Sequence, residues 1–320
     1  MINKNNVIEC YDYEQIVNYI YDDSNLETEP PSGSVYVATE LFKEFITRFG
    51  NNNKKYIIFS GASDYGIEPH TPETIPNLMA PSMWLSQHMW KVDPLQLGLK
   101  GIEQPSRCIV ENCNLNDKFC AKIVYHVRYT FNEIPNNIIW YVANNLINEP
   151  NVHYLPYGIL RGSRNTLHEY MTKADFSKKQ NKIYVNIQCS NEYRAHLKRY
   201  MKTISHYDNR IVFSETKSYS EYLEDLLKYK YVFSPPGNGW DCARFYECLY
   251  MQSIPIVFDS PLIRKMNFPM VVCPSDMINN IFCEANYYDW DKILNTDGSN
   301  INWDIPELSV DFWRKKCELT

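Results

Sequence analysis

The sequence is short of glycine and contains no long apolar run. Only 11 of its 320 residues are glycine. No stretch approaches the roughly 18 to 20 consecutive apolar residues that cross a bilayer, and the polar start MINKNN lacks the apolar core of a signal peptide. We therefore expect a cytoplasmic protein without a membrane span.

Positive charge and paired cysteines are also scarce. Lysine and arginine together number 32 against 38 acidic residues, so the formal net charge is -6 and nucleic acid is not an expected partner. The ten cysteines form no CxxC pair, which indicates reduced structural residues and no metal site. No GxGxxG follows an early strand with an acidic residue about twenty positions later, which argues against a dehydrogenase.

Apolar residues, in contrast, are plentiful at 44% of the chain, enough for a sizeable core. Short β-branched runs bounded by polar turns predict the buried strands of parallel sheets. These runs lie at residues 56–59, 108–110, 138–141, 183–187, 211–213, 231–233, 254–258 and 270–272. Helical patterns lie between them, for example at residues 35–49, so the sequence predicts an α/β fold.

One local unit is especially clear. Ser218 and Glu221 form a capping box that predicts a helix ending near residue 230. A strand, a Gly-rich turn at residues 235–239, a helix from about 241 to 252 and another strand follow. This order places a ligand pocket at the carboxyl end of a parallel strand.

The chain divides into two halves. A charged, unpatterned stretch at residues 161–182 predicts a boundary near residue 160. We expect an α/β domain at residues 1–160, a second at 161–290 and a C-terminal segment at 291–320. A terminal helix at residues 303–317 is expected to pack back on the first half.

The turn and the helix after it carry candidate chemistry. Glycines allow positive φ and close backbone approach, and free N–H groups at a helix start attract an anion such as a diphosphate. Arg244 and Glu247 lie three residues apart, so the cation can neutralise phosphate oxygens while the carboxylate accepts ribose hydroxyls. An exposed ion pair beside an ordinary turn explains the same spacing equally well.

A longer pattern favours the first interpretation. Residues 230–258, KYVFSPPGNGWDCARFYECLYMQSIPIVF, resemble the C-terminal signature of exostosin-like glycosyltransferases and related viral and eukaryotic enzymes. Weaker similarities lie at residues 59–65, 140–145, 155–159 and 184–188. The resemblance implies a GT-B-like fold, with two Rossmann-like domains facing a cleft, and a site in the host cytoplasm for a viral member. It implies a nucleotide-sugar donor bound by the second half, a carbohydrate or glycan acceptor bound by the first, and no obligatory metal or other cofactor.

The resemblance, together with the positions of polar residues at strand ends and turns, gives the candidate site residues. Arg244 is expected to act in catalysis as well as in donor binding. The full set expected to bind the donor is Gly158, Asn186, Gln188, Ser234, Pro236, Gly237, Asn238, Gly239, Asp241, Arg244 and Glu247. Asp64 is the candidate base for the acceptor hydroxyl, with His70 as a second candidate; a turn-capping role explains Asp64 equally well. Gly158 is expected to let the backbone approach the ligand, and Arg194 is interpreted as a surface residue rather than a phosphate ligand.

One departure keeps an alternative open. Relatives tend to have histidine just before the arginine, where this chain has Ala243. The alternative function is a non-catalytic protein that binds a nucleotide-sugar or carbohydrate on a degenerate glycosyltransferase fold.

Overall fold

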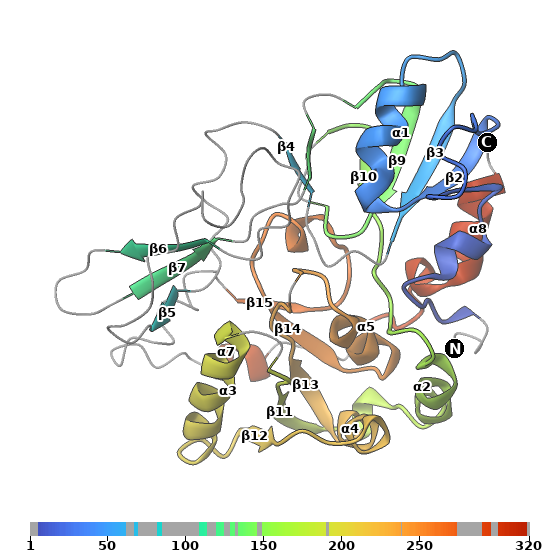
Figure 1. Ribbon diagram of the computed structural model, residues 1–320. Helices are drawn as coiled ribbons and strands as arrows, with labels where there is room; N and C mark the ends of the chain where they lie inside the picture. The colour runs from blue at the N-terminus through green and yellow to red at the C-terminus, as the bar shows by residue number, and fades with distance from the viewer. Residues whose placement is uncertain are drawn as a thin grey trace.

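The computed structural model describes residues 6–61, 67–69, 82–84, 109–113, 120–124, 129–131, 134–145, 149–189, 192–237, 239–273, 290–295 and 300–318. These residues form an α/β protein with two five-stranded sheets whose paired strands all run parallel (Figure 1). The predicted α/β class is therefore confirmed. None of the helices in these ranges has the length and apolar character of a membrane span.

The first sheet follows the order of the chain. Its strands, from one edge to the other, are β1 (Tyr19–Tyr21), β2 (Gly33–Val37), β3 (Tyr56–Ser60), β9 (Ile138–Val142) and β10 (Val152–Tyr154). Side chains alternate between its faces. Ile58 packs under α1 (Phe42–Phe49), whereas Phe59 packs on the opposite face against Trp313 of the C-terminal helix α8 (Val310–Glu318).

The second sheet has a reversal in its strand order. The order across the sheet is β12 (Ile211–Ser214), β11 (Gln180–Asn186), β13 (Tyr229–Phe233), β14 (Ile254–Phe258) and β15 (Val271–Cys273). The chain adds β12 on one side of β11 and then crosses to add β13 on the other. Ligands of open α/β sheets bind outside the carboxyl ends of the strands at such a reversal. The loops after β11 and β13 are therefore the expected ligand-binding edge.

Helices cover both faces of the second sheet. On one face lie α3 (Glu192–Ser205) and α7 (Trp290–Leu294), and on the other lie α2 (Arg164–Met171), α4 (Tyr219–Leu226) and α5 (Ala243–Tyr250). Short 3-10 helices connect several elements: η2 (Asp12–Gln15), η3 (Thr39–Leu41), η5 (Phe176–Lys178), η6 (Ile263–Lys265) and η7 (Pro306–Leu308). Two small sheets complete the described strands: β4 (Ile67–Pro69) with β8 (Tyr129–Phe131), and β5 (Ser82–Trp84) with β6 (Ile109–Cys113) and β7 (Cys120–Val124).

Both ends of the described chain connect the halves. Val7 is buried in the core beside α4 and α5, and α8 lies beside β2 although it comes from the other end of the chain (Figure 1). The Tyr250 hydroxyl of α5 accepts a hydrogen bond from Ile8 N at 2.9 Å and donates one to Leu308 O at 2.7 Å. One tyrosine thus holds the N-terminal and C-terminal segments against the second half.

Two sequence predictions of local structure are corrected. The helical pattern at residues 35–49 contains strand β2 followed by α1, because Val35 and Val37 are fully buried in the sheet between β1 and β3. The capping box at Ser218 is confirmed, but its helix ends at Leu226 instead of near residue 230, since Tyr229 already belongs to β13.

The stretch at residues 161–182 is also more ordered than its composition indicated, because it contains α2. Glu9 accepts hydrogen bonds from the Arg164 and Gly162 amides at 2.9 and 3.1 Å. The start of α2 is thus capped by a residue about 150 positions earlier in the chain, which a local pattern does not reveal.

A buried lysine joins the ends of α4 and α5. Lys179 is 5% exposed, and its ammonium donates hydrogen bonds to Leu226 O, to Met251 O at 2.7 Å and to Ser253 Oγ at 2.8 Å. The two carbonyls lie at or just after the ends of α4 and α5, where helix carbonyls lack intrahelical partners. Burial lowers the pKa of Lys179 to about 7.

We predict that Lys179→Ala lowers the free energy of unfolding by about 2 to 4 kcal/mol, because it removes three buried hydrogen bonds. Urea unfolding followed by circular dichroism measures the change. The matched control is Lys178→Ala, whose side chain is 81% exposed in an ion pair with Asp175 and is expected to cost less than about 1 kcal/mol. Equal losses in the two variants would contradict the role of Lys179.

Candidate functional site

The turn after β13 leaves the sheet at two consecutive prolines. Ser234 N makes the last bond of the strand, to Ile256 O at 2.9 Å, and the next two residues, Pro235 and Pro236, have no N–H to donate. Gly237 N then donates to Gly239 O at 2.9 Å. Of the two properties that glycine allows here, Gly237 does not use a positive φ, so its role is to allow close packing rather than a left-handed backbone.

Helix α5 begins without a side-chain cap. Its N-cap, Cys242, makes no capping hydrogen bond, and no acidic residue lies in the first turn. Instead the first turn contains Arg244. A cation at this end opposes the helix dipole, so an anion bound there would stabilise both the helix start and the arginine.

Arg244 and Glu247 do not form the exposed ion pair that the spacing also allowed. Glu247 is only 5% exposed, and no ion pair joins these two described side chains. The Arg244 guanidinium lies over the Tyr222 ring, 5.5 Å from its centroid, and its Nε and Nη1 atoms are buried without a hydrogen-bond partner. A buried guanidinium with unused donors is unfavourable by itself and favours an acceptor ligand.

The polar cluster around Arg244 includes two tyrosines of α4. The hydroxyls of Tyr219 and Tyr222 are buried near the Glu247 carboxylate and, like the two Arg244 atoms, make no hydrogen bond of ordinary geometry. Across the described ranges six buried side-chain atoms lack a partner, and four of them belong to this cluster. Burial raises the pKa of Glu247, while the charge of Arg244 and the nearby hydroxyls of Tyr222 and Tyr219 lower it. The region between α4 and α5 thus contains buried hydrogen-bonding groups that could bind a ligand, as expected of a binding site.

Asp241 joins the halves. It is 3% exposed, and its Oδ2 accepts hydrogen bonds from Tyr246 OH at 2.7 Å, Tyr154 OH at 3.1 Å and Tyr157 N at 3.1 Å. Its own amide donates to Asn144 Oδ1 at 2.8 Å. One carboxyl oxygen is therefore engaged by both halves, and Oδ1 is buried without a partner.

A second contact lies on the same seam. Lys265 of η6 donates to Asn145 Oδ1 at 3.2 Å, and burial lowers the pKa of this lysine to about 8. Asn144 and Asn145 follow the carboxyl end of β9, while Asp241 and Lys265 follow those of β13 and β14. The carboxyl edges of the two sheets therefore meet at this seam.

Other predicted residues have different surroundings. Asn186 is buried at the end of β11 and donates from Nδ2 to Glu215 O at 2.7 Å, whereas Gln188 is exposed two residues later. Gly158 has a φ of +78°, and a Cβ there would lie 2.6 Å from Ile8 O, so its close approach is to the N-terminal segment. Asp64, His70 and Asn238 lie outside the described residues.

Arg194 is not the surface residue that we expected. It is 8% exposed, and its guanidinium donates from Nε to Pro236 O at 2.8 Å and from Nη2 to Pro235 O at 2.9 Å. The sequence interpretation failed because the partners are backbone carbonyls of a distant loop, which no local pattern encodes.

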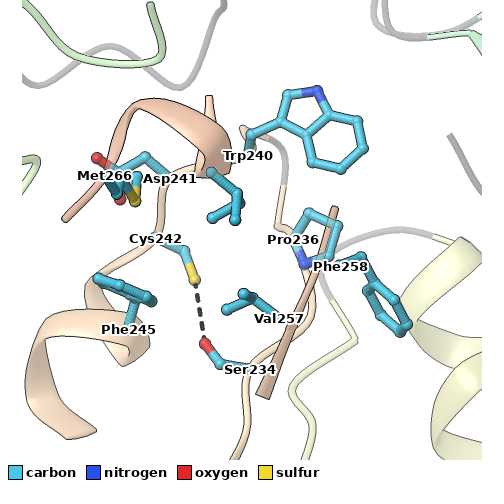
Figure 2. Close-up of a pocket in the computed structure, with 10 residues that line it drawn as sticks. Ser234, Pro236, Trp240, Asp241, Cys242, Phe245, Val257, Phe258 and Met266 are labelled. Atoms are coloured by element: carbon cyan, nitrogen blue, oxygen red, sulfur yellow. Dashed lines mark hydrogen bonds between the residues drawn. The ribbon is translucent and has the colours of Figure 1, made fainter. Parts of the chain in front are cut away.

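A small apolar hollow lies on the other side of the turn. Figure 2 shows the residues that line it as sticks, with a dashed line for the long hydrogen bond of 3.8 Å between Ser234 Oγ and Cys242 Sγ. The lining residues are Ser234, Pro236, Trp240, Asp241, Cys242, Phe245, Val257, Phe258, Ile263 and Met266. Its empty space of about 290 Å³ includes open solvent, and neither Arg244 nor Glu247 lines it. The hollow is therefore separate from the polar cluster.

Sequence reasoning missed the tyrosines and the seam. Neither Tyr219 nor Tyr222 was among the residues predicted for the site. The sequence shows both tyrosines within four residues of the helix cap at Ser218. It does not show that α5 places Arg244 beside them, which is what makes their hydroxyls part of the site. Within the described ranges no group of histidine, cysteine and acidic side chains could hold a metal ion.

No protein-family model matches the chain. No curated protein sequence matches it significantly either.

We predict a pH dependence of stability from Asp241. Burial raises its pKa from an ordinary 3.8 to about 7, although hydrogen bonds from Tyr246, Tyr157 and Tyr154 oppose the shift. Between about pH 4 and pH 7 the folded protein keeps a proton that the unfolded chain has lost. The free energy of unfolding therefore falls as the pH rises through this window, by at most about 1.4 kcal/mol per pH unit.

Asp241→Asn is expected to remove this part of the slope, which urea unfolding at about four pH values across the window would measure. The control is Asp304→Asn, at an exposed position, which should leave the profile unchanged. Parallel profiles for wild type and Asp241→Asn would contradict the assignment.

Proposed function

We propose that the protein is a GT-B-type glycosyltransferase that moves a sugar from a nucleotide-sugar donor to a hydroxyl acceptor. The observation that carries the proposal is the cluster of Arg244, Glu247, Tyr219 and Tyr222, which has four buried polar atoms that make no hydrogen bond of ordinary geometry. It adjoins the uncapped start of α5, which follows one of the two strands at the reversal in the second sheet. Cation, helix start and strand reversal together favour an anionic ligand of nucleotide type.

In this proposal Arg244 neutralises the diphosphate. Charge builds up on the diphosphate as its bond to the sugar breaks and the bond to the acceptor oxygen forms, so a fixed guanidinium stabilises the transition state more than the ground state. Glu247 accepts hydrogen bonds from the ribose hydroxyls. Asp64 remains the proposed base, and the carboxyl edge to which β3 leads is the edge that meets the second half.

A binding protein without turnover is the second candidate function. It is favoured by Ala243, which stands where the related enzymes tend to have histidine. Both candidates require nucleotide binding through Arg244, and they differ only in sugar transfer.

We predict that one class of nucleotide-sugar stabilises the purified protein against heat. Thermal unfolding with UDP-, GDP-, CMP- and dTDP-linked sugars, with and without EDTA, identifies the class. A ligand at about 100 times its Kd adds about 2.7 kcal/mol to the stability of the folded state. The shift is expected to persist in EDTA and to be lost in Arg244→Ala and in Glu247→Gln, with affinity reduced about tenfold or more.

Matched controls are available in the same half. Arg199→Ala on α3 and Glu224→Gln on α4 change exposed side chains of the same types and should keep the full shift. A folded wild-type protein that none of these sugars stabilises would refute the donor site. Stabilisation without release of nucleoside diphosphate, in the presence of an array of glycan acceptors, would favour the binding protein.

A further inference from the structure

Arg194 holds the two loops at the strand reversal together. It lies in the first turn of α3, which follows β11, and its guanidinium donates to two successive carbonyls of the turn that follows β13. Both distances, 2.8 and 2.9 Å, are those of charge-assisted hydrogen bonds. The planar fork of arginine suits two neighbouring acceptors, whereas the single ammonium of lysine does not reproduce it.

The turn depends on this fork because of its two prolines. Pro235 and Pro236 cannot donate to the backbone of a neighbouring strand, so the turn leaves the sheet directly after Ser234 N. Both prolines are buried, and buried carbonyls need donors. Arg194 of α3 supplies a donor to each of these two carbonyls.

The fork also sets the direction of the next amide. In a planar trans peptide the carbonyl and the following N–H point in opposite directions. With Pro236 O directed at Arg194, the Gly237 N–H points away from α3, and it donates to Gly239 O. A Cβ at Gly237 would lie 3.4 Å from Arg194 Nη2, so the guanidinium packs directly against the turn at this point.

We infer that Arg194 is a positioning residue that holds the turn at residues 235–239 in the shape that receives the anionic part of the nucleotide. This inference rests on the proposed function. Because its Nε and Nη2 donate to carbonyls, Arg194 acts through the turn, while its charge adds to the positive potential at the start of α5. Arg244 remains the residue that meets the ligand.

The test separates the shape of the turn from ligand binding. Amide hydrogen exchange of a peptide covering residues 233–242 is measured without ligand in wild type, Arg194→Lys and the control Arg199→Lys, which changes an exposed side chain of the same helix. Binding of UDP, GDP, CMP and dTDP is measured by calorimetry on the same samples. We expect Arg194→Lys to exchange about tenfold faster in this peptide, to leave α8 unchanged, and to bind the nucleotide about tenfold more weakly.

A chemical rescue covers the case in which a variant is poorly folded. Arg194→Ala is expected to recover slow exchange and nucleotide affinity when methylguanidinium is added, whereas methylammonium should have no effect. Recovery of both properties would support positioning by the fork, which general loss of stability does not explain.

Two outcomes would overturn the inference: unchanged exchange of the turn peptide in Arg194→Lys, or faster exchange with undiminished nucleotide affinity. Failure of the proposed function has a different signature. In that case wild type binds none of UDP, GDP, CMP and dTDP, while faster exchange in Arg194→Lys still establishes the anchoring of the turn.

Discussion

The buried carboxyl group of Asp241 is the constraint on which the arrangement of the halves depends. A carboxyl group removed from water must be surrounded by donors, and here the donors come from Tyr154 and Tyr157 at the end of the first half and from Tyr246 in the second. Because Asp241 lies directly before Cys242, the N-cap of α5, the same contacts help to fix where that helix starts. The orientation of Arg244, three residues later, follows from a contact between the halves.

Both sheets are parallel, but they differ in strand order and therefore in whether a ligand-binding crevice forms at their edge. The first sheet adds its strands in chain order, while the second reverses between β11 and β13. At a reversal the connections leave to opposite faces and open a crevice between the loops. In this protein the loops are tied by Arg194, and the helix start beside them carries Arg244. Strand order therefore explains why the candidate site belongs to the second half.

Local patterns predicted the elements whose formation is decided locally. Strand β14 occupies residues 254–258 as predicted, since its apolar run is short and bounded by Ser253, and the capping box at Ser218 forms as its spacing indicates. The pattern at residues 35–49 failed because valines that suit one helix face also suit a strand with neighbours on both sides.

The candidate site was predictable only in part. The spacing of Arg244 and Glu247 selected the helix that carries both candidate residues, but Arg194 and Asp241 make contacts with partners between about 40 and 100 positions away, such as Pro236 and Tyr154. Contacts at that separation are set by packing of whole elements. No periodicity in the sequence records them.

The crossing of the chain ends has a consequence for how the protein can be divided. Val7 completes the core of the second half, and Trp313 completes that of the first, with Tyr250 holding both terminal segments. A cut near residue 160 would therefore yield two fragments with incomplete cores. The N-terminal fragment would lack Trp313, and the C-terminal fragment would lack Val7. The core of each half includes a segment from the opposite end of the chain. Neither half is therefore encoded by one continuous stretch of sequence.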